Sequence, residues 1–149
     1  MSSIDLIKKL RDETGAGVMD AKKALEKSAD DFEKAKSYLK EKGIEKAAKK
    51  SDREIKAGKI FAYIHGEGTV GAIAKLGCET DFVAKNDEFV KLGNEIAMQI
   101  AAMKPESVEG LLEQDYIRDP SKKVNDLITE AVSKIGENIT IVDIACFEV

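Results

Sequence analysis

In residues 4–39, apolar side chains recur at every third or fourth position, the spacing that places them on one face of an α-helix. Three such segments follow one another, separated by residues that favour turns, such as those of 14–17. Their apolar positions are Ile4, Ile7 and Leu10, then Ala21, Ala24 and Leu25, then Phe32, Ala35, Tyr38 and Leu39. The pattern predicts three short helices packed as a small bundle. The first is capped by Ser3, and the third ends at Gly43, because glycine is common just past a helix end.

The periodicity changes at Lys59, where the pattern becomes typical of β-structure. Residues 59–64 predict a strand, residues 65–69 a hairpin loop, and residues 70–78 the returning strand. A glycine inside the returning strand, at position 71 or 77, indicates a bulge or the close approach of another group. We therefore expect an antiparallel hairpin here.

The rest of the chain alternates helical and strand-like segments. Apolar residues at helical spacing predict a long helix over 87–104, a short helix starting at Ser107 and a last helix over 121–135. Residues 139–149 predict a terminal strand. The order strand, hairpin, helices, strand indicates a three-stranded antiparallel sheet with helices packed on one face, which is an α+β architecture.

A charged stretch at 45–54 separates the helical segments from the strands. Its acidic and basic residues are interleaved, which is more typical of a solvated linker than of a nucleic-acid-binding patch. We therefore predict two modules. Residues 1–54 form a three-helix N-terminal module with its linker helix, and residues 55–149 form an α+β core domain.

Composition and charge argue against several classes of function. The chain has 149 residues, with 24 Lys and Arg against 28 Asp and Glu, and its net charge of −4 argues against direct binding of nucleic acid. No apolar run approaches the roughly 20 residues needed to cross a bilayer, and the N-terminal sequence does not resemble a secretory signal. We expect a cytoplasmic protein with no membrane partner. One His and two widely spaced Cys predict no metal site, no cofactor site and no disulfide framework.

Cys78 and His65 are the remaining candidates for chemistry. Cys78 ends the returning strand with no histidine near it in sequence, so a small buried residue is a better interpretation than a nucleophile. His65 begins the hairpin loop, where we expect a solvated side chain rather than a base or ligand. An enzyme using Cys78 with Glu79 and Asp81 is the weakest functional hypothesis, and we expect no enzymatic activity.

The segment after Cys78 is the candidate functional segment. Thr80 or Asp81 can cap a helical turn there, and Phe82 lies where the chain leaves the sheet. Phe82 can pack into the local core, or it can stand exposed beside the Asp81 carboxylate on a rigid platform. The second arrangement suits a protein interface, because aromatic residues are enriched among interface anchors. The residue types alone leave both interpretations open.

Two long contiguous motifs resemble those of the elongation factor Ts family. The family's N-terminal signature is similar to residues 7–25, IKKLRDETGAGVMDAKKAL, and its core signature is similar to residues 79–86, ETDFVAKN. Residues 136–139, GENI, also resemble the family. These motifs occur in the family's order, and the resemblance extends over nearly the whole chain. Members of this family are guanine-nucleotide exchange factors of elongation factor Tu.

The resemblance implies a mechanism of partner binding without enzymatic chemistry. The N-terminal helices would form a ubiquitin-associated-like bundle that docks on the nucleotide domain of elongation factor Tu through Arg11, Thr14, Gly15, Val18 and Met19. The core would enter that domain near its Mg²⁺ site and dislodge the ion through Thr80, Asp81, Phe82 and Val83. Loss of Mg²⁺ leaves phosphate charge less compensated, so GDP dissociates faster. By linkage, the factor and GDP each weaken the binding of the other.

The chain departs from the family pattern in length and at two positions. Val18 and Ala21 stand where many members have Met and Cys, both apolar changes. There is no room for the second core subdomain and helical-hairpin insertion of longer members. The resemblance therefore suggests a homodimer through the core sheet, although a terminal strand buried in a monomer explains its apolar pattern equally well. The alternative function is a non-catalytic interaction adaptor with a helical ubiquitin-associated-like module and a core that serves as a dimerisation platform.

Overall fold

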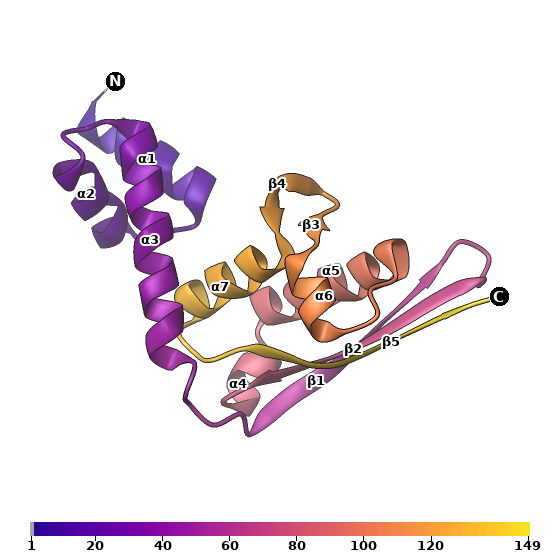
Figure 1. Ribbon diagram of the computed structural model, residues 1–149. Helices are drawn as coiled ribbons and strands as arrows, with labels where there is room; N and C mark the ends of the chain where they lie inside the picture. The colour runs from indigo at the N-terminus through magenta and orange to yellow at the C-terminus, as the bar shows by residue number, and fades with distance from the viewer. Residues whose placement is uncertain (1) are drawn as a thin grey trace.

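Three helices form the N-terminal end of the computed structural model, which describes residues 2–149 (Figure 1). Helix α1 spans Ser3–Thr14, α2 spans Val18–Lys27 and α3 spans Phe32–Lys50. Their apolar faces meet in a cluster of buried residues formed by Leu10, Ala21, Ala24, Leu25 and Ala35. The predicted three-helix bundle is confirmed.

Capping residues set the ends of these helices. The Ser2 hydroxyl accepts a hydrogen bond from the Asp5 N–H at 3.2 Å, and the Asp5 carboxylate accepts one from the Ser2 hydroxyl at 2.7 Å. Ser2 therefore caps α1 in place of Ser3. Gly15 ends α1 with a left-handed φ of 72°, a conformation that glycine adopts without steric cost. Asp31 caps α3 by accepting from the Lys34 N–H.

Gly43 does not end α3, and the prediction of a helix stop there is wrong. The helix continues to Lys50 and includes most of the stretch that we expected to form a separate linker helix. A Cβ at Gly43 would lie 3.5 Å from the Ser133 Oγ of α7 (Val124–Ile135), so the glycine lies where the two helices approach each other. This tertiary contact outweighs the cost of a helical glycine, about 1 kcal/mol. The module boundary at residue 54 stays a prediction.

The three-stranded antiparallel sheet is confirmed and has the order β1-β2-β5. Strand β1 spans Ala57–His65, β2 spans Val70–Cys78 and β5 spans Thr140–Glu148. The pairing of β2 with β5 shifts by one residue between Lys75 and Leu76. A Cβ at Gly77 would lie 2.4 Å from Ile55 Cγ2, which accounts for a glycine inside this strand.

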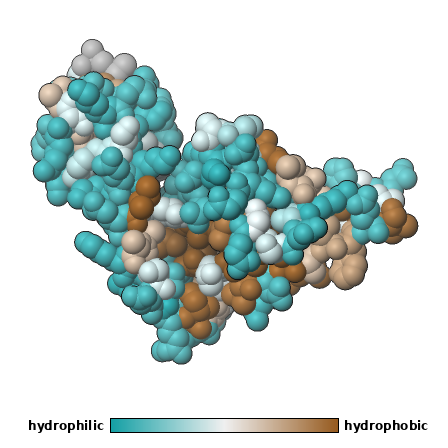
Figure 2. Space-filling view, viewed as in Figure 1, coloured by the Kyte–Doolittle hydropathy of each residue, from teal (hydrophilic) through white to brown (hydrophobic). Residues whose placement is uncertain are grey.

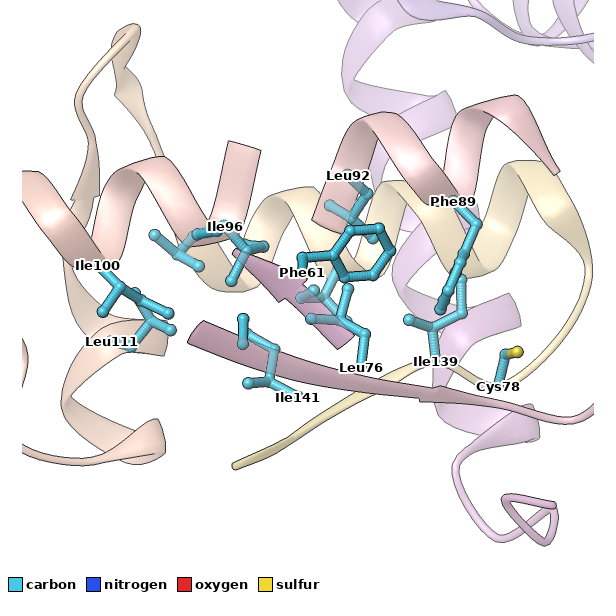
Figure 3. Packing of buried hydrophobic residues seen from close by; sticks show 14 of the residues in the cluster. Phe61, Leu76, Cys78, Phe89, Leu92, Ile96, Ile100, Leu111, Ile139 and Ile141 are labelled. Atoms are coloured by element: carbon cyan, nitrogen blue, oxygen red, sulfur yellow. The ribbon is translucent and has the colours of Figure 1, made fainter. Parts of the chain in front are cut away.

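Helices cover one face of this sheet (Figure 1). Helix α4 spans Asp81–Ala84, α5 spans Asp87–Met103 and α6 spans Val108–Glu113, and α7 lies beside α5. Figure 3 shows side chains that fill the space between the sheet and α5, among them Phe61, Leu76, Ile141, Phe89, Ile96 and Ile100. This larger core is separate from the cluster in the N-terminal bundle and holds the sheet rigidly against the helices.

A second hairpin, of β3 (Asp115–Tyr116) and β4 (Asp119–Lys123), was not predicted. It occupies part of the segment that we assigned to the last helix, so α7 begins at Val124 instead of Ser121. The hairpin is held by Gln99 of α5, a fully buried side chain. The Gln99 amide donates to the Asp115 carbonyl at 3.0 Å, and its oxygen accepts from the Ile117 N–H at 3.0 Å.

Candidate partner-binding site

The candidate site is the turn that joins β2 to α4. The last strand residue is Cys78, and α4 begins only three residues later, at Asp81. Thr80 caps the helix, and its hydroxyl accepts a hydrogen bond from the Val83 N–H at 3.4 Å. Of the two caps considered, Thr80 is the one observed. The short connection leaves the turn little conformational freedom.

Asp81 and Phe82 project from this turn, and the interpretation in which Phe82 packs into the local core is wrong. The Phe82 side chain is 89% exposed, while the next residue, Val83, is 8% exposed and belongs to the core. Asp81 is exposed beside Phe82. The turn therefore anchors itself through Val83 and Ala84 and presents an aromatic ring next to a carboxylate.

The opposite side of the turn is held by residues just after α7. One Glu137 carboxylate oxygen accepts hydrogen bonds from the N–H groups of Glu79 and Thr80, at 3.1 and 3.0 Å. The other accepts from the Thr80 hydroxyl at 2.7 Å. The Asn138 N–H donates to the Glu79 carboxylate at 2.7 Å. Glu137 and Asn138 were not predicted as site residues, although the resemblance of residues 136–139 to the family was a signal.

Cys78 is a structural residue of this region, as predicted. Its side chain is fully buried, and its thiol donates to the Thr80 carbonyl at 3.3 Å. Burial, together with the negative charge of Glu137, raises the pKa of the Cys78 thiol. A thiol with a raised pKa is protonated at neutral pH and is a poor nucleophile. His65 is exposed, as expected, and its Nδ1 lies 3.0 Å from the Tyr63 hydroxyl.

Within residues 2–149, no cluster of three or more His, Cys, Asp or Glu side chains is arranged to hold a metal ion. Over the same residues, every helix is too short or too polar to cross a bilayer. What the turn offers is a fixed aromatic contact and a negative charge, which suits binding to another protein.

The predicted N-terminal contact residues gather around the turn between α1 and α2. All five are exposed: Arg11, Thr14, Gly15, Val18 and Met19. The Thr14 hydroxyl donates to the Leu10 carbonyl and accepts from the Ala16 N–H, which shapes the turn. Val18 and Met19 open α2 and are 48% and 73% exposed. The turn between α1 and α2 lies alongside α3 (Figure 1), where the Lys46 ammonium of α3 lies 3.3 Å from the Asp20 carboxylate of α2. A Cβ at Gly15 would lie 3.5 Å from the Lys134 Nζ of α7.

Comparison with known proteins identifies the family. The sequence profile described as Elongation factor TS matches residues 79–149, which include both the Thr80–Val83 turn and Glu137. Elongation factor Ts of Leptospira biflexa is 43% identical over 192 aligned positions, which cover 99% of this chain and 97% of that protein. Elongation factor Ts of Coprothermobacter proteolyticus is 44% identical over 184 positions, covering 93% of each chain. The chain belongs to the elongation factor Ts family.

Membership of the elongation factor Ts family makes the chain a translation elongation factor, with a role in protein biosynthesis. Elongation factor Ts of Thermotoga neapolitana is 43% identical over 190 positions, covering 99% of this chain and 96% of that protein. These alignments are longer than the 149 residues of the chain. The relatives therefore contain segments that face gaps in this chain.

Proposed function

We propose that this chain accelerates the release of GDP from elongation factor Tu by inserting Asp81 and Phe82 beside the Mg²⁺ and phosphate site of the partner's nucleotide domain. The observation that supports the proposal is the 89% exposure of the Phe82 ring on a turn that is anchored by the buried Val83 and by the hydrogen bonds of Thr80 to Glu137. An aromatic ring held in water without core contacts is poorly placed for stability and well placed for an interface.

The proposed mechanism needs contact and no covalent chemistry. In a nucleotide site, Mg²⁺ bridges and neutralises phosphate oxygens, so moving its ligands weakens the hold on GDP. Phe82 occupies space between elements of the partner, and Asp81 brings a negative charge close to the phosphates. The chain accelerates release by binding the nucleotide-free partner more tightly than the GDP-bound partner, and GDP weakens binding of the chain by the same factor.

The N-terminal module supplies a second contact in this proposal. Val18 and Met19 expose apolar side chains at the start of α2, next to the turn shaped by Thr14 and Gly15. We place this surface on the partner's nucleotide domain. Two contacts carried by one chain raise the effective concentration of the Thr80–Val83 turn at its target, because the first contact holds the second nearby.

We also propose that two chains pair through the uncovered face of the sheet. Helices cover the face that carries Phe61 and Leu76, whereas the outer face carries large apolar side chains that are 44–76% exposed. They are Ile60, Ile64, Ile73, Val142 and Phe147. Figure 2 shows apolar residues gathered over the strands. A sheet with one solvated face ordinarily carries polar residues there, so this pattern favours a second copy as its cover.

The remaining parts of the proposal concern location and partner class. We propose that this chain acts in the cytoplasm, binds other proteins, and binds neither nucleic acid nor membranes directly. The net charge of −4 supports the exclusion of nucleic acid, since the phosphate backbone attracts positively charged surfaces.

Release of fluorescent GDP from elongation factor Tu, followed by stopped flow, tests the exchange function. We expect the chain at micromolar concentration to accelerate release, and the double variant Asp81→Ala with Phe82→Ala to lose most of that acceleration. Ile117→Ala is the matched control, because Ile117 is an exposed apolar residue on the distant β3–β4 hairpin. No acceleration by the unaltered chain would contradict the proposal.

A further inference from the structure

We propose that Glu137 is a positioning residue for nucleotide exchange, whose carboxylate holds the backbone from which Asp81 and Phe82 project. The inference rests on the proposed function and deepens it. It concerns the residue that orients the Thr80–Val83 turn, called the contact turn below. The proposed function concerns the residues of that turn that touch the partner.

The geometry shows one carboxylate serving three donors of the same turn. Glu137 accepts from the N–H groups of Glu79 and Thr80 and from the Thr80 hydroxyl, at 3.1, 3.0 and 2.7 Å. Hydrogen bonds to an ionised acceptor are stronger than those between neutral groups. The sheet pairing ends at Cys78 and α4 begins at Asp81, so the donors of residues 79 and 80 belong to neither element. Glu137 gives them a partner.

The chain is organised to bring Glu137 to this place. Gly136 ends α7 with a left-handed φ of 89°, and the chain then turns toward β5. Glu137 follows directly and reaches a residue 57 positions earlier in the sequence. The contact therefore joins the end of α7 to the end of β2, two elements that are themselves packed in the core.

Asn138 extends the same network to the N-terminal module. Its side-chain amide donates to the carbonyls of Ser51 and Arg53, at 3.3 and 2.9 Å. The Arg53 guanidinium lies 3.7 Å from the Glu79 carboxylate, which also accepts from the Asn138 N–H. The network thus joins the segment after α3 and the contact turn to the same two residues, Glu137 and Asn138. It fixes the contact turn relative to the end of the helix that leads to the N-terminal surface.

The role follows from where the turn is anchored and where it is free. Val83 and Ala84 fix the later side of the turn through burial. The earlier side has Glu137 and the Thr80 cap, and Phe82 itself gains nothing from the core. Without the carboxylate, the Asp81–Phe82 backbone samples more orientations. Binding to the partner must then select one of these orientations, which costs conformational free energy. In the unaltered protein the turn is already ordered in the free state, so binding does not carry this cost.

The first experiment observes the turn in the free protein. The chain contains no tryptophan, so Phe82→Trp supplies a single reporter at the tip of the turn. We expect Glu137→Ala to add a fast component to the tryptophan anisotropy decay. Glu137→Gln should have a smaller effect because its amide oxygen still accepts from the two N–H groups. The control is Glu130→Ala, a carboxylate of α7 that pairs with Lys122 at 3.0 Å and makes none of the hydrogen bonds to the turn. An unchanged decay in Glu137→Ala overturns the proposal.

The second experiment is a double-mutant cycle on exchange. Glu137→Ala should lower the catalysed rate at subsaturating concentration by roughly three- to tenfold, the cost of ordering the freed side chains. The same change should have no further effect when Asp81 and Phe82 are already alanine, because nothing is left to position. An additive loss means that Glu137 acts by another route and overturns the proposal.

The two readouts separate the inference from the function on which it rests. If the unaltered chain accelerates no GDP release, the proposed function fails, and the anisotropy decay alone decides whether Glu137 holds the turn. If exchange occurs and the decay is unchanged by Glu137→Ala, the function stands and the positioning role fails. Circular dichroism and thermal melts confirm that each variant is folded at the assay temperature, and Glu137→Gln replaces Glu137→Ala if the alanine variant is not.

Discussion

The ring of Phe61 occupies the space that a side chain at Gly93 would need. A Cβ at position 93 would lie 2.2 Å from Phe61 Cε2, closer than any real contact between such atoms. Gly93 is a buried residue within α5, and Phe61 lies on the inner face of β1. The glycine therefore sets how closely the helix that follows the contact turn approaches the sheet.

We expect Gly93→Ala to destabilise the protein by about 1–3 kcal/mol, because an added methyl in a filled core forces the ring or the helix to move. Gly43→Ala, in α3, should stabilise it by about 0.5–1 kcal/mol, since the new Cβ meets Ser133 at ordinary contact distance and alanine favours a helix. Urea denaturation measures both. Equal changes in unfolding free energy for the two substitutions would show that helix propensity, rather than the contact with Phe61, decides the result.

Phe82→Ala should slow catalysed GDP release by about 30-fold or more, the effect of losing an interface anchor worth about 2 kcal/mol. Its unfolding free energy should change by less than about 0.5 kcal/mol, because the ring has no core contacts to lose. Val83→Ala should do the reverse and lower stability by about 1–3 kcal/mol, since Val83 is buried. Stopped-flow exchange and thermal melts distinguish the two. Phe82→Ala with normal exchange places the contact elsewhere.

Met19→Ala should raise the concentration of the chain that gives half-maximal exchange and leave the saturating rate unchanged. The N-terminal surface formed by the five predicted contact residues adds binding energy without reaching the nucleotide site. Its loss therefore weakens binding to the GDP-bound and to the nucleotide-free partner by the same factor. Titration of the stopped-flow rate measures both quantities. Ile4→Ala is the control, an exposed apolar residue of α1 outside the predicted contact set. A drop in the saturating rate would assign Met19 a part in nucleotide release.

Ile73→Lys should convert a homodimer to a monomer, because it places a charge at the middle of the apolar outer face of β2. Size-exclusion chromatography with light scattering gives the mass before and after the change. Ile117→Lys, on the β3–β4 hairpin, should leave the mass unaltered. A monomeric mass for the unaltered chain at a concentration of about 100 μM would refute pairing through the sheet, since stable interfaces have micromolar or tighter dissociation constants.

Stability should fall as pH rises above 10 because of Tyr116. Burial and the 2.5 Å hydrogen bond to Glu95 raise the pKa of Tyr116 to about 12, above its ordinary value of 10.0. Between these values the folded chain keeps a proton that the unfolded chain has lost, so the unfolding free energy decreases with pH. Below pH 10 both states are protonated, and the contribution is fully present. Urea midpoints from pH 9 to 12 should fall more steeply for the unaltered chain than for Tyr116→Phe, and parallel curves would contradict this.

Local sequence rules predicted most of the elements. Helix boundary signals act over a few residues, and the short helix predicted to start at Ser107 is capped by Ser107 in the structure. Two strand-like segments on either side of the 65–69 loop likewise predicted the hairpin. The rules failed where a distant contact decides. The β3–β4 hairpin depends on Gln99, and α3 continues through Gly43 because α7 packs against it.

The candidate site divides in the same way. Thr80 as a cap was visible in the sequence, because a cap needs only the residues that follow it. The direction of Phe82 was not, because an aromatic residue after a strand fits either the core or an interface. The structure decides it through Val83, which takes the place in the core and leaves Phe82 outside.

The sequence by itself determined the three N-terminal helices, the three-stranded sheet, the α+β class and the family, since all of these are carried by short contiguous patterns. Only the tertiary structure decided that Phe82 is exposed and that Glu137 holds the turn beneath it. Glu137 and Thr80 are 57 positions apart, and no local propensity relates residues at that separation. Their contact exists because α7 and β2 pack in one core, which brings a carboxylate to two N–H groups that have no other partner in the sheet or the helix.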